Sequence, residues 1–132
     1  MLSILLLEDD CDDSEIITDI IRGISPGCRV NCFVEVDEVF DHLSQLSREE
    51  YPALIILDYN LPKVSGMEFL KLFNADKRYK NIPVVMYTTS ARDNNRLEAL
   101  KLGCKMYNIK KNTAELMKKD VKEMLTYCNF PL

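Results

Sequence analysis

The sequence of 132 residues predicts an α/β fold, in which a doubly wound parallel β-sheet is covered by helices on both faces. Short runs that are apolar at nearly every position alternate with longer segments whose apolar residues recur at helical spacing. Continuous apolar runs are typical of strands buried on both faces, and strands that alternate with helices form parallel sheets. The alternation occurs five times, so we expect five βα units in a single domain over residues 1–132.

The first half of the chain supplies three of the five strands. They are expected at residues 3–8, 29–35 and 53–57. The helix after the first strand would have Asp12 or Asp13 as its N-cap and would end at Pro26 and Gly27. Its apolar face consists of Ile16, Ile17, Ile20, Ile21 and Ile24. The same spacing predicts a second helix at Val36, Val39, Phe40, Leu43 and Leu46.

The second half repeats this plan. A helix over residues 65–79 is expected to bury Phe69, Leu70, Leu72 and Phe73. A strand at residues 83–87 follows, then a helix over residues 92–102 that Gly103 closes, and a short strand at residues 105–109. The last helix has its apolar face at Met117, Val121, Met124, Leu125 and Cys128.

Composition and charge exclude several classes of protein. A formal charge of −4 and a pI near 5.0 argue against direct nucleic-acid binding. No apolar run approaches the ~18–20 residues of a membrane span. Five scattered cysteines without a CxxC pair indicate reduced thiols that fill core positions in a cytoplasmic protein. The single histidine, His42, has no nucleophile-elbow sequence to accompany it, which argues against a hydrolytic triad.

Polar side chains follow four of the predicted strands. The first strand ends in Glu8, Asp9 and Asp10, the third in Asp58, the fourth in Thr88, Thr89 and Ser90, and the fifth near Lys110 and Lys111. A doubly wound sheet brings these carboxyl ends to one edge. Crowded carboxylates repel one another unless a proton or a cation neutralises them, and hard oxygen ligands suit Mg²⁺. With hydroxyl and lysine donors alongside, this edge is predicted to hold a metal ion and a phosphoryl group together.

Nucleotide binding is the main rival for this class of fold. The chain has neither GxGxxG nor GxxxxGK[ST], and it contains 4 glycines. A flavin phosphate would need backbone and hydroxyl donors after the first strand, whereas the loop there is rich in carboxylates that oppose a phosphate. The nucleotide-binding interpretations are therefore weak.

Four blocks of the sequence resemble the response-regulator receiver family. They are Ile-Leu-Leu-Leu-Glu-Asp-Asp, Leu-Ile-Ile-Leu-Asp-Tyr-Asn-Leu-Pro-Lys-Val-Ser-Gly, Ile-Pro-Val-Val-Met-Tyr-Thr-Thr-Ser-Ala and Tyr-Asn-Ile-Lys. The likeness covers approximately residues 3–128. It implies a flavodoxin-like (βα)5 fold with strand order 2-1-3-4-5, and a receiver domain without an output domain.

The resemblance implies a role for each acidic residue at the strand ends. Asp58 would be the phosphoacceptor, a carboxylate nucleophile that takes a phosphoryl group from a kinase histidine. Asp9 would bind Mg²⁺ directly and Glu8 would act through metal-bound water. Asp58 itself and the backbone carbonyl of Asn60 would complete the protein's share of the coordination. Asp10, Asp12 and Asp13 are expected to be capping or solvated residues.

Three further residues would stabilise and report the phosphorylated state. Lys110 would pair with the acceptor carboxylate and then with a phosphoryl oxygen, Thr88 would hydrogen-bond the phosphoryl group, and Tyr107 would be the aromatic switch residue. The chain departs from the family pattern in two places. Lys111 stands where proline is usual, so we expect a trans peptide and a surface lysine there. Thr89 stands where a small residue is usual, and its bulk should narrow access to the acceptor.

The expected function is that of a stand-alone receiver, a phosphoacceptor rather than a turnover enzyme. It would receive its phosphoryl group from a sensor histidine kinase or a phosphotransfer protein and would signal by contact with an unidentified protein. A binding module that no longer switches by phosphorylation is the main alternative. A Mg²⁺-dependent phosphatase is disfavoured because Asn60 stands where a second catalytic acid would be needed.

The charge is distributed unevenly along the chain. Residues 1–60 carry 14 acidic and 3 basic residues, and residues 61–132 carry 7 acidic and 14 basic residues. The basic excess would lie around the fourth helix, the last strand and the fifth helix. This face is either a site for a partner or a second copy of the chain, or a solvated surface.

Overall fold

The computed structural model describes residues 2–90 and 92–128, and it confirms the predicted sheet. The five strands are β1 (Ser3–Leu7), β2 (Arg29–Phe33), β3 (Leu54–Leu57), β4 (Val84–Thr88) and β5 (Met106–Ile109). All neighbouring pairs are parallel and the order is β2-β1-β3-β4-β5, as the family resemblance implies. The carboxyl ends of β1, β3, β4 and β5 therefore lie along one edge.

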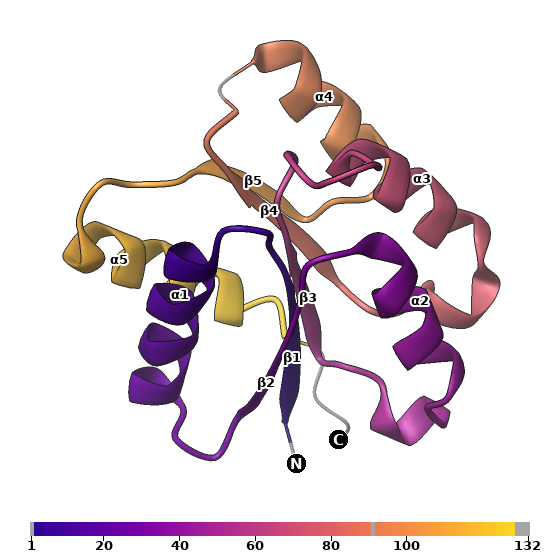
Figure 1. The fold of residues 1–132 in the computed structure, drawn as a ribbon, viewed down its shortest axis with the longest axis horizontal. Helices are drawn as coiled ribbons and strands as arrows, with labels where there is room; N and C mark the ends of the chain where they lie inside the picture. The colour runs from indigo at the N-terminus through magenta and orange to yellow at the C-terminus, as the bar shows by residue number, and fades with distance from the viewer. Residues whose placement is uncertain (1, 91, 129–132) are drawn as a thin grey trace.

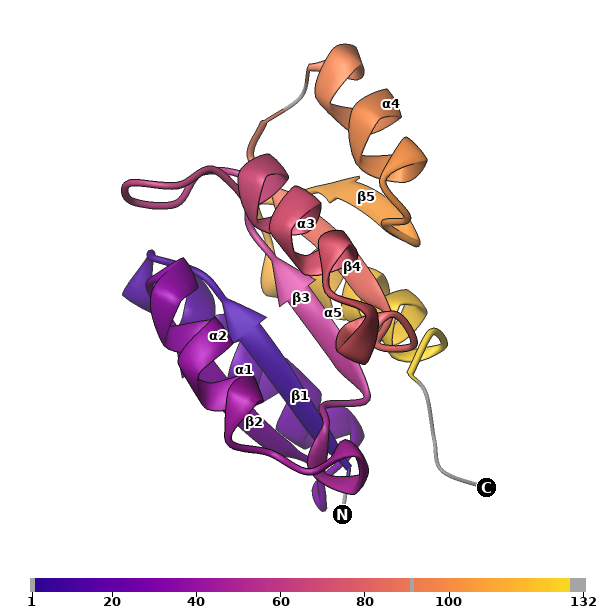
Figure 2. The ribbon, with the colours of Figure 1, turned by 90° about the vertical axis from the view of Figure 1, so that its right-hand side faces the viewer.

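Five α-helices connect the strands and cover both faces of the sheet. They are α1 (Cys11–Ile24), α2 (Val36–Ser44), α3 (Gly66–Ala75), α4 (Asp93–Lys101) and α5 (Ala114–Leu125). Figure 1 shows α1 and α5 on one side of the sheet and α2 and α3 on the other. In Figure 2, α4 lies beyond α3, next to β5. None of the helices in residues 2–90 and 92–128 is long and apolar enough to cross a membrane.

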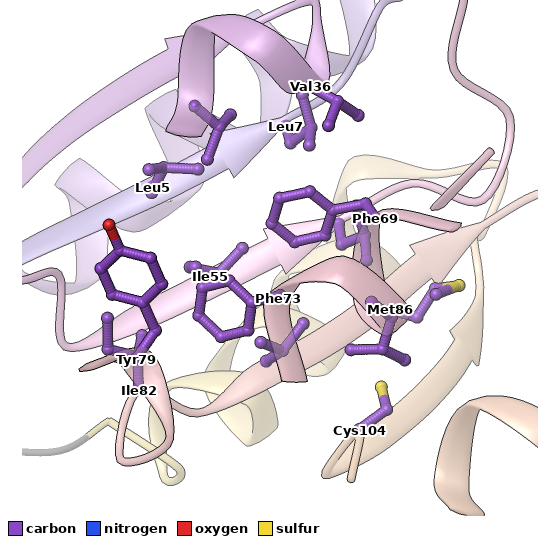
Figure 3. Packing of buried hydrophobic residues seen from close by; sticks show 14 of the residues in the cluster. Leu5, Leu7, Val36, Ile55, Phe69, Phe73, Tyr79, Ile82, Met86 and Cys104 are labelled. Carbon is purple, nitrogen blue, oxygen red and sulfur yellow. The ribbon is translucent and has the colours of Figure 1, made fainter. Parts of the chain in front are cut away.

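Alternate residues along the strands pack into two separate hydrophobic cores, one on each face of the sheet. On β1, Leu5 and Leu7 belong to the core under α2 and α3, whereas Ile4 and Leu6 belong to the core under α1 and α5. This follows from the period of two residues along a strand. Figure 3 shows the first core, in which Phe73 stacks on Tyr79 with ring centroids 5.5 Å apart.

The start of α1 differs from the sequence prediction. Neither Asp12 nor Asp13 is the N-cap, because the Asp10 carboxylate accepts hydrogen bonds from the backbone N–H groups of both, at 2.9 Å and 3.1 Å. The helix begins at Cys11, directly after the loop from β1, so the cap falls earlier in the chain. Asp13 is consequently in the first turn, where its own carboxylate is free to reach another element.

The helix predicted over residues 65–79 is shorter than expected. It ends at Ala75, and Asp76 starts a separate 3₁₀ helix over Lys77–Tyr79, with its carboxylate accepting from the Arg78 N–H at 3.0 Å. A second 3₁₀ helix spans Arg48–Glu50. Leu72 was expected to be buried but is 55% exposed, because it lies on the outer face of α3.

The cysteines divide into buried and exposed thiols. Cys28 and Cys104 are buried, as expected of small core residues, and Cys128 is half-buried. Cys11 and Cys32 are exposed, which contradicts the expectation that the cysteines fill the core. Cys11 is the first residue of α1 and Cys32 lies on the edge strand β2, and both positions leave a side chain open to solvent.

Candidate functional site

Four residues predicted at the strand ends meet at the carboxyl edge of the sheet. Glu8 follows β1, Asp58 follows β3, Thr88 ends β4 and Lys110 follows β5. Glu8 and Asp58 are only 2% and 5% exposed, and Thr88 is fully buried. Burial of charged groups is costly unless they are paired, so the contacts among these side chains determine what the site can do.

The Lys110 ammonium lies at the centre of this group. It contacts the carboxylates of Glu8, Asp13 and Asp58, the last two at 2.8 Å and 3.3 Å. Its backbone N–H donates to the Thr88 carbonyl at 2.8 Å, which holds the ends of β4 and β5 together. Asp13 was expected to cap a helix or face solvent, so its contact with the lysine corrects that prediction. We call Glu8, Asp9, Asp13, Asp58 and Lys110 the rim cluster.

The backbone around Asp58 is held closely. The Asp58 N–H donates to the Leu7 carbonyl at 3.0 Å, and one Asp58 carboxylate oxygen accepts from the Asn60 N–H at 3.2 Å. A Cβ atom on Gly66 would lie 2.3 Å from the Asp58 carbonyl oxygen and 2.9 Å from the Tyr59 Cα. A side chain at this position would displace the Asp58 backbone, which explains why glycine stands eight residues after the aspartate.

Burial and neighbouring charges separate the pKa values of the two buried carboxyls. Burial raises the pKa of Glu8 to about 8, and its hydrogen bond with Asp58 adds to the rise. Burial also acts on Asp58, but hydrogen bonds from Glu8 and Thr88 and the Lys110 ammonium outweigh it and lower the Asp58 pKa. The surrounding carboxylates raise the pKa of Lys110 although its burial opposes this. At neutral pH, Asp58 is therefore ionised.

The acidic residues are arranged to bind a cation. Carboxylate oxygens of Glu8, Asp9 and Asp58 all lie within 4.8 Å of one another. Asp9 is exposed, so the group opens to solvent on one side. Hard oxygen donors with open positions fit a divalent cation that keeps some of its water. Asn60 lies close to Asp58, and its backbone contacts the Asp58 carboxylate through the N–H group rather than through the carbonyl group.

Thr88 and Tyr107 converge on one segment. The Thr88 hydroxyl accepts from the Ser90 N–H at 3.2 Å, and the Tyr107 hydroxyl donates to the Ser90 carbonyl at 2.9 Å. The Tyr107 ring is buried, and the Asn95 amide donates to the Ser90 hydroxyl at 3.1 Å. The stretch after β4 thus connects the hydroxyl beside Asp58 with the aromatic ring on β5. Thr89 is exposed, and its effect on access to Asp58 stays a prediction.

Lys111 belongs to a second polar cluster, formed with residues of β4, β5 and α5. Its ammonium lies 3.2 Å from the Asp120 carboxylate and donates to the Ile109 carbonyl at 2.8 Å. The same carboxylate accepts from the Tyr87 hydroxyl at 2.9 Å and from the Asn108 amide at 3.5 Å. We call Tyr87, Asn108, Lys111 and Asp120 the Asp120 cluster.

The structure also tests the expectations for Lys111. No cis peptide occurs in the described part of the chain, so the Lys110–Lys111 bond is trans as predicted. Lys111 is exposed, as expected of a surface lysine, but its ammonium is paired with Asp120. Asp120 is 8% exposed and was missed entirely, since a lone acid in an amphipathic helix gives no signal of burial.

The chain is similar in sequence to known proteins over most of its length. The response regulator receiver domain family matches residues 4–122. The chain is 27% identical over 114 residues to a chemotaxis protein CheY homologue of Campylobacter jejuni, which covers 86% of this chain and 88% of the relative. It is also 27% identical over 128 residues to the chemotaxis protein CheY of Pseudomonas aeruginosa, covering 97% and 99% of the two chains.

Two solved structures resemble the whole chain. The Mn²⁺-bound form of the response regulator Rcp1 superimposes with a TM-score of 0.85 at 26% identity, over 100% of both chains. The phosphorylated cyanobacterial phytochrome response regulator RcpA gives a TM-score of 0.86 at 27% identity, over 99% of both chains.

Proposed function

Because this chain belongs to the response regulator receiver domain family, we propose that its Asp58 carboxylate accepts a phosphoryl group from a histidine of a sensor kinase or a phosphotransfer protein. The observation that carries the proposal is the contact of one lysine with the acceptor and its neighbouring acids at the carboxyl edge of the sheet. The chain is a phosphoacceptor rather than a turnover enzyme.

The residues around Asp58 support each part of the transfer. An Asp58 carboxylate oxygen attacks phosphorus as the bond from phosphorus to the histidine nitrogen breaks, and the histidine leaves as neutral imidazole after protonation by solvent. The lowered pKa of Asp58 keeps it ionised for the attack at neutral pH. After the transfer, the Lys110 ammonium pairs with a phosphoryl oxygen instead of the carboxylate. The Thr88 hydroxyl donates a hydrogen bond to a second phosphoryl oxygen.

The donor set fits Mg²⁺ as the cation. Glu8, Asp9 and Asp58 would hold it, with the backbone carbonyl of Asn60 completing the protein's share. When bound, Mg²⁺ neutralises charge on the transferred phosphoryl group. The Mn²⁺-bound relative supports the binding of a divalent cation, and the phosphorylated relative supports phosphorylation.

Phosphorylation would be read by protein contacts. The added charge of about −1.5 to −2 at Asp58 draws the Thr88 hydroxyl and, through Ser90, alters the seat of the Tyr107 ring. The surface formed by α4, β5 and α5 would pass this change to a downstream protein or to a second copy of the chain, in the cytoplasm. The exposed side chains of Leu97, Leu100 and Leu116 on α4 and α5 support such contacts.

The proposal is tested by the intact mass of the protein after incubation with acetyl phosphate, with and without Mg²⁺. We expect one phosphoryl adduct that requires Mg²⁺ and that is absent from Asp58→Asn. Asp13→Asn is the matched control, because it removes another carboxylate from the rim cluster and should keep the adduct. The acyl phosphate can be short-lived, so beryllofluoride binding is measured in parallel. Failure of both would favour a receiver-like module that acts without phosphorylation.

A further inference from the structure

The Asp120 cluster is connected to the candidate site through residues that are neighbours in the chain. Tyr87 precedes Thr88 on β4, and Lys111 follows Lys110 after β5. Because successive side chains of a strand point to opposite faces, Tyr87 lies in the core under α1 and α5 while Thr88 faces the acids. Asp120 on α5 therefore contacts Tyr87 and Lys111. These two residues are adjacent in the chain to Thr88 and Lys110, which act on Asp58.

The two adjacent lysines are held in different clusters, Lys110 by acids that include Asp13 of α1 and Lys111 by Asp120 of α5. The Lys110 ammonium enters the rim cluster, whereas the Lys111 ammonium pairs with Asp120 and with the Ile109 carbonyl. Because Lys111 stands where proline is usual, no proline ring fixes the backbone dihedral angle φ at this position. Contacts of the Lys111 side chain must supply the restraint instead. A buried carboxylate with one ammonium and two neutral donors is well satisfied, and it forms a fixed anchor on α5.

We propose that Lys111 and Asp120 are positioning residues for phosphoryl transfer: their ion pair holds the segment after β5 so that the Lys110 ammonium lies against Asp58. The proposal rests on the proposed function of Asp58 as the phosphoacceptor. Neither Lys111 nor Asp120 touches the reacting atoms. Their effect on the reaction passes through Lys110, which gives the proposal a signature that a purely structural role would not have.

The test compares rates of phosphorylation by acetyl phosphate at saturating Mg²⁺, followed by intact mass. Misplacing a reacting group by about 1 Å can cost up to about a hundredfold in rate, so we expect Lys111→Met and Asp120→Asn each to lower the rate about tenfold. The double variant should be no slower than the slower single variant. Lys111→Arg keeps the ion pair and should stay within about twofold of the wild type.

The decisive arm places Lys111→Met in a Lys110→Met background. If Lys111 acts through Lys110, the second substitution leaves the residual rate unchanged. Lys119→Met is the matched charge control, because Lys119 is an exposed lysine on α5, and it should have the wild-type rate. If Asp120→Asn does not fold, the Lys111 variants carry the test alone.

Two outcomes would overturn the proposal. One is a wild-type rate for both Lys111→Met and Asp120→Asn, and the other is a further loss of rate from Lys111→Met when Lys110 is already absent. Failure of the wild-type protein to form any Asp58-dependent adduct would instead contradict the proposed function.

Discussion

The rim cluster and the Asp120 cluster are built around neighbouring lysines but differ in charge balance. In the rim cluster, one ammonium meets the carboxylates of Glu8, Asp13 and Asp58, and Asp9 is close by. In the Asp120 cluster, one ammonium meets one carboxylate, and a phenol and an amide complete its hydrogen bonds. Each cluster combines two buried residues with an exposed one, so burial alone does not distinguish the functional one.

The surplus of negative charge makes the rim cluster chemically responsive. One lysine cannot neutralise all of its carboxylates. A proton or a divalent cation must therefore supply the rest of the positive charge. The balanced Asp120 cluster has no such deficit and holds a single arrangement. Chemistry is expected where the charges fail to cancel, and positioning is expected where they cancel.

The largest expected effect separates the two lysines by the reaction rate. Lys110→Met should lower the rate of phosphorylation by acetyl phosphate about 10²–10³-fold, because it removes a donor aimed at the developing charge on the phosphoryl oxygens. Lys111→Met should cost about tenfold, because it only loosens the positioning of Lys110. Time courses by intact mass give both rates. Equal losses in the two variants would mean that the clusters do not have different roles.

The next effect is a dependence of stability on pH that arises in the rim cluster. The pKa of Glu8 is about 8 in the folded protein and has an ordinary value of 4.5. A raised carboxyl pKa favours the folded state while the group is protonated, so without a divalent cation the free energy of unfolding should fall as pH rises from about 5 to about 8. A loss of about 3–4 kcal/mol is expected over this range, since each pKa unit corresponds to about 1.4 kcal/mol.

Denaturant unfolding in EDTA at several pH values measures this dependence. Glu8→Gln should flatten it, because the amide does not titrate. Glu50→Gln is the control, since the Glu50 pKa is lowered and its contribution changes only below about pH 4.5. A slope that persists in Glu8→Gln would place the titrating group elsewhere.

The smallest effect compares two buried tyrosines. The Tyr87 hydroxyl donates to Asp120, whereas the Tyr79 hydroxyl is the one buried side-chain polar atom without a hydrogen-bond partner in the described part of the chain. Tyr87→Phe should lower the free energy of unfolding by about 1–2 kcal/mol, because a hydrogen bond to a charged group is lost. Tyr79→Phe should leave it unchanged or raise it slightly. Urea unfolding resolves the two, and an equal cost at both positions would contradict the assignment.

Most of the candidate site could be predicted because strand ends are easy to place. Glu8, Asp58, Thr88 and Lys110 each follow an apolar run, and the parallel topology then brings them to one edge. Their roles come from the family resemblance rather than from this argument. The sequence pattern therefore predicts where the site lies better than it predicts the contacts within the site.

The missed residues depend on helix phase and burial, which local patterns specify poorly. Asp10, Asp12 and Asp13 are equally plausible caps by residue type, and only the observed start of α1 at Cys11 sends the Asp13 carboxylate to Lys110. Asp120 has the sequence context of an exposed helical acid, yet Tyr87 and Lys111 reach it from β4 and the following segment. Such contacts between distant elements appear only when the fold is assembled.

Two buried cysteines, one in each hydrophobic core, can report when that core opens. Cys104 is buried in the core under α2 and α3, and Cys28 is buried in the core under α1 and α5. Burial raises the pKa of both thiols, so neither reacts readily until its layer opens. Pulsed alkylation, read by mass spectrometry at each thiol, would therefore time the opening of the two layers separately in the unmodified chain.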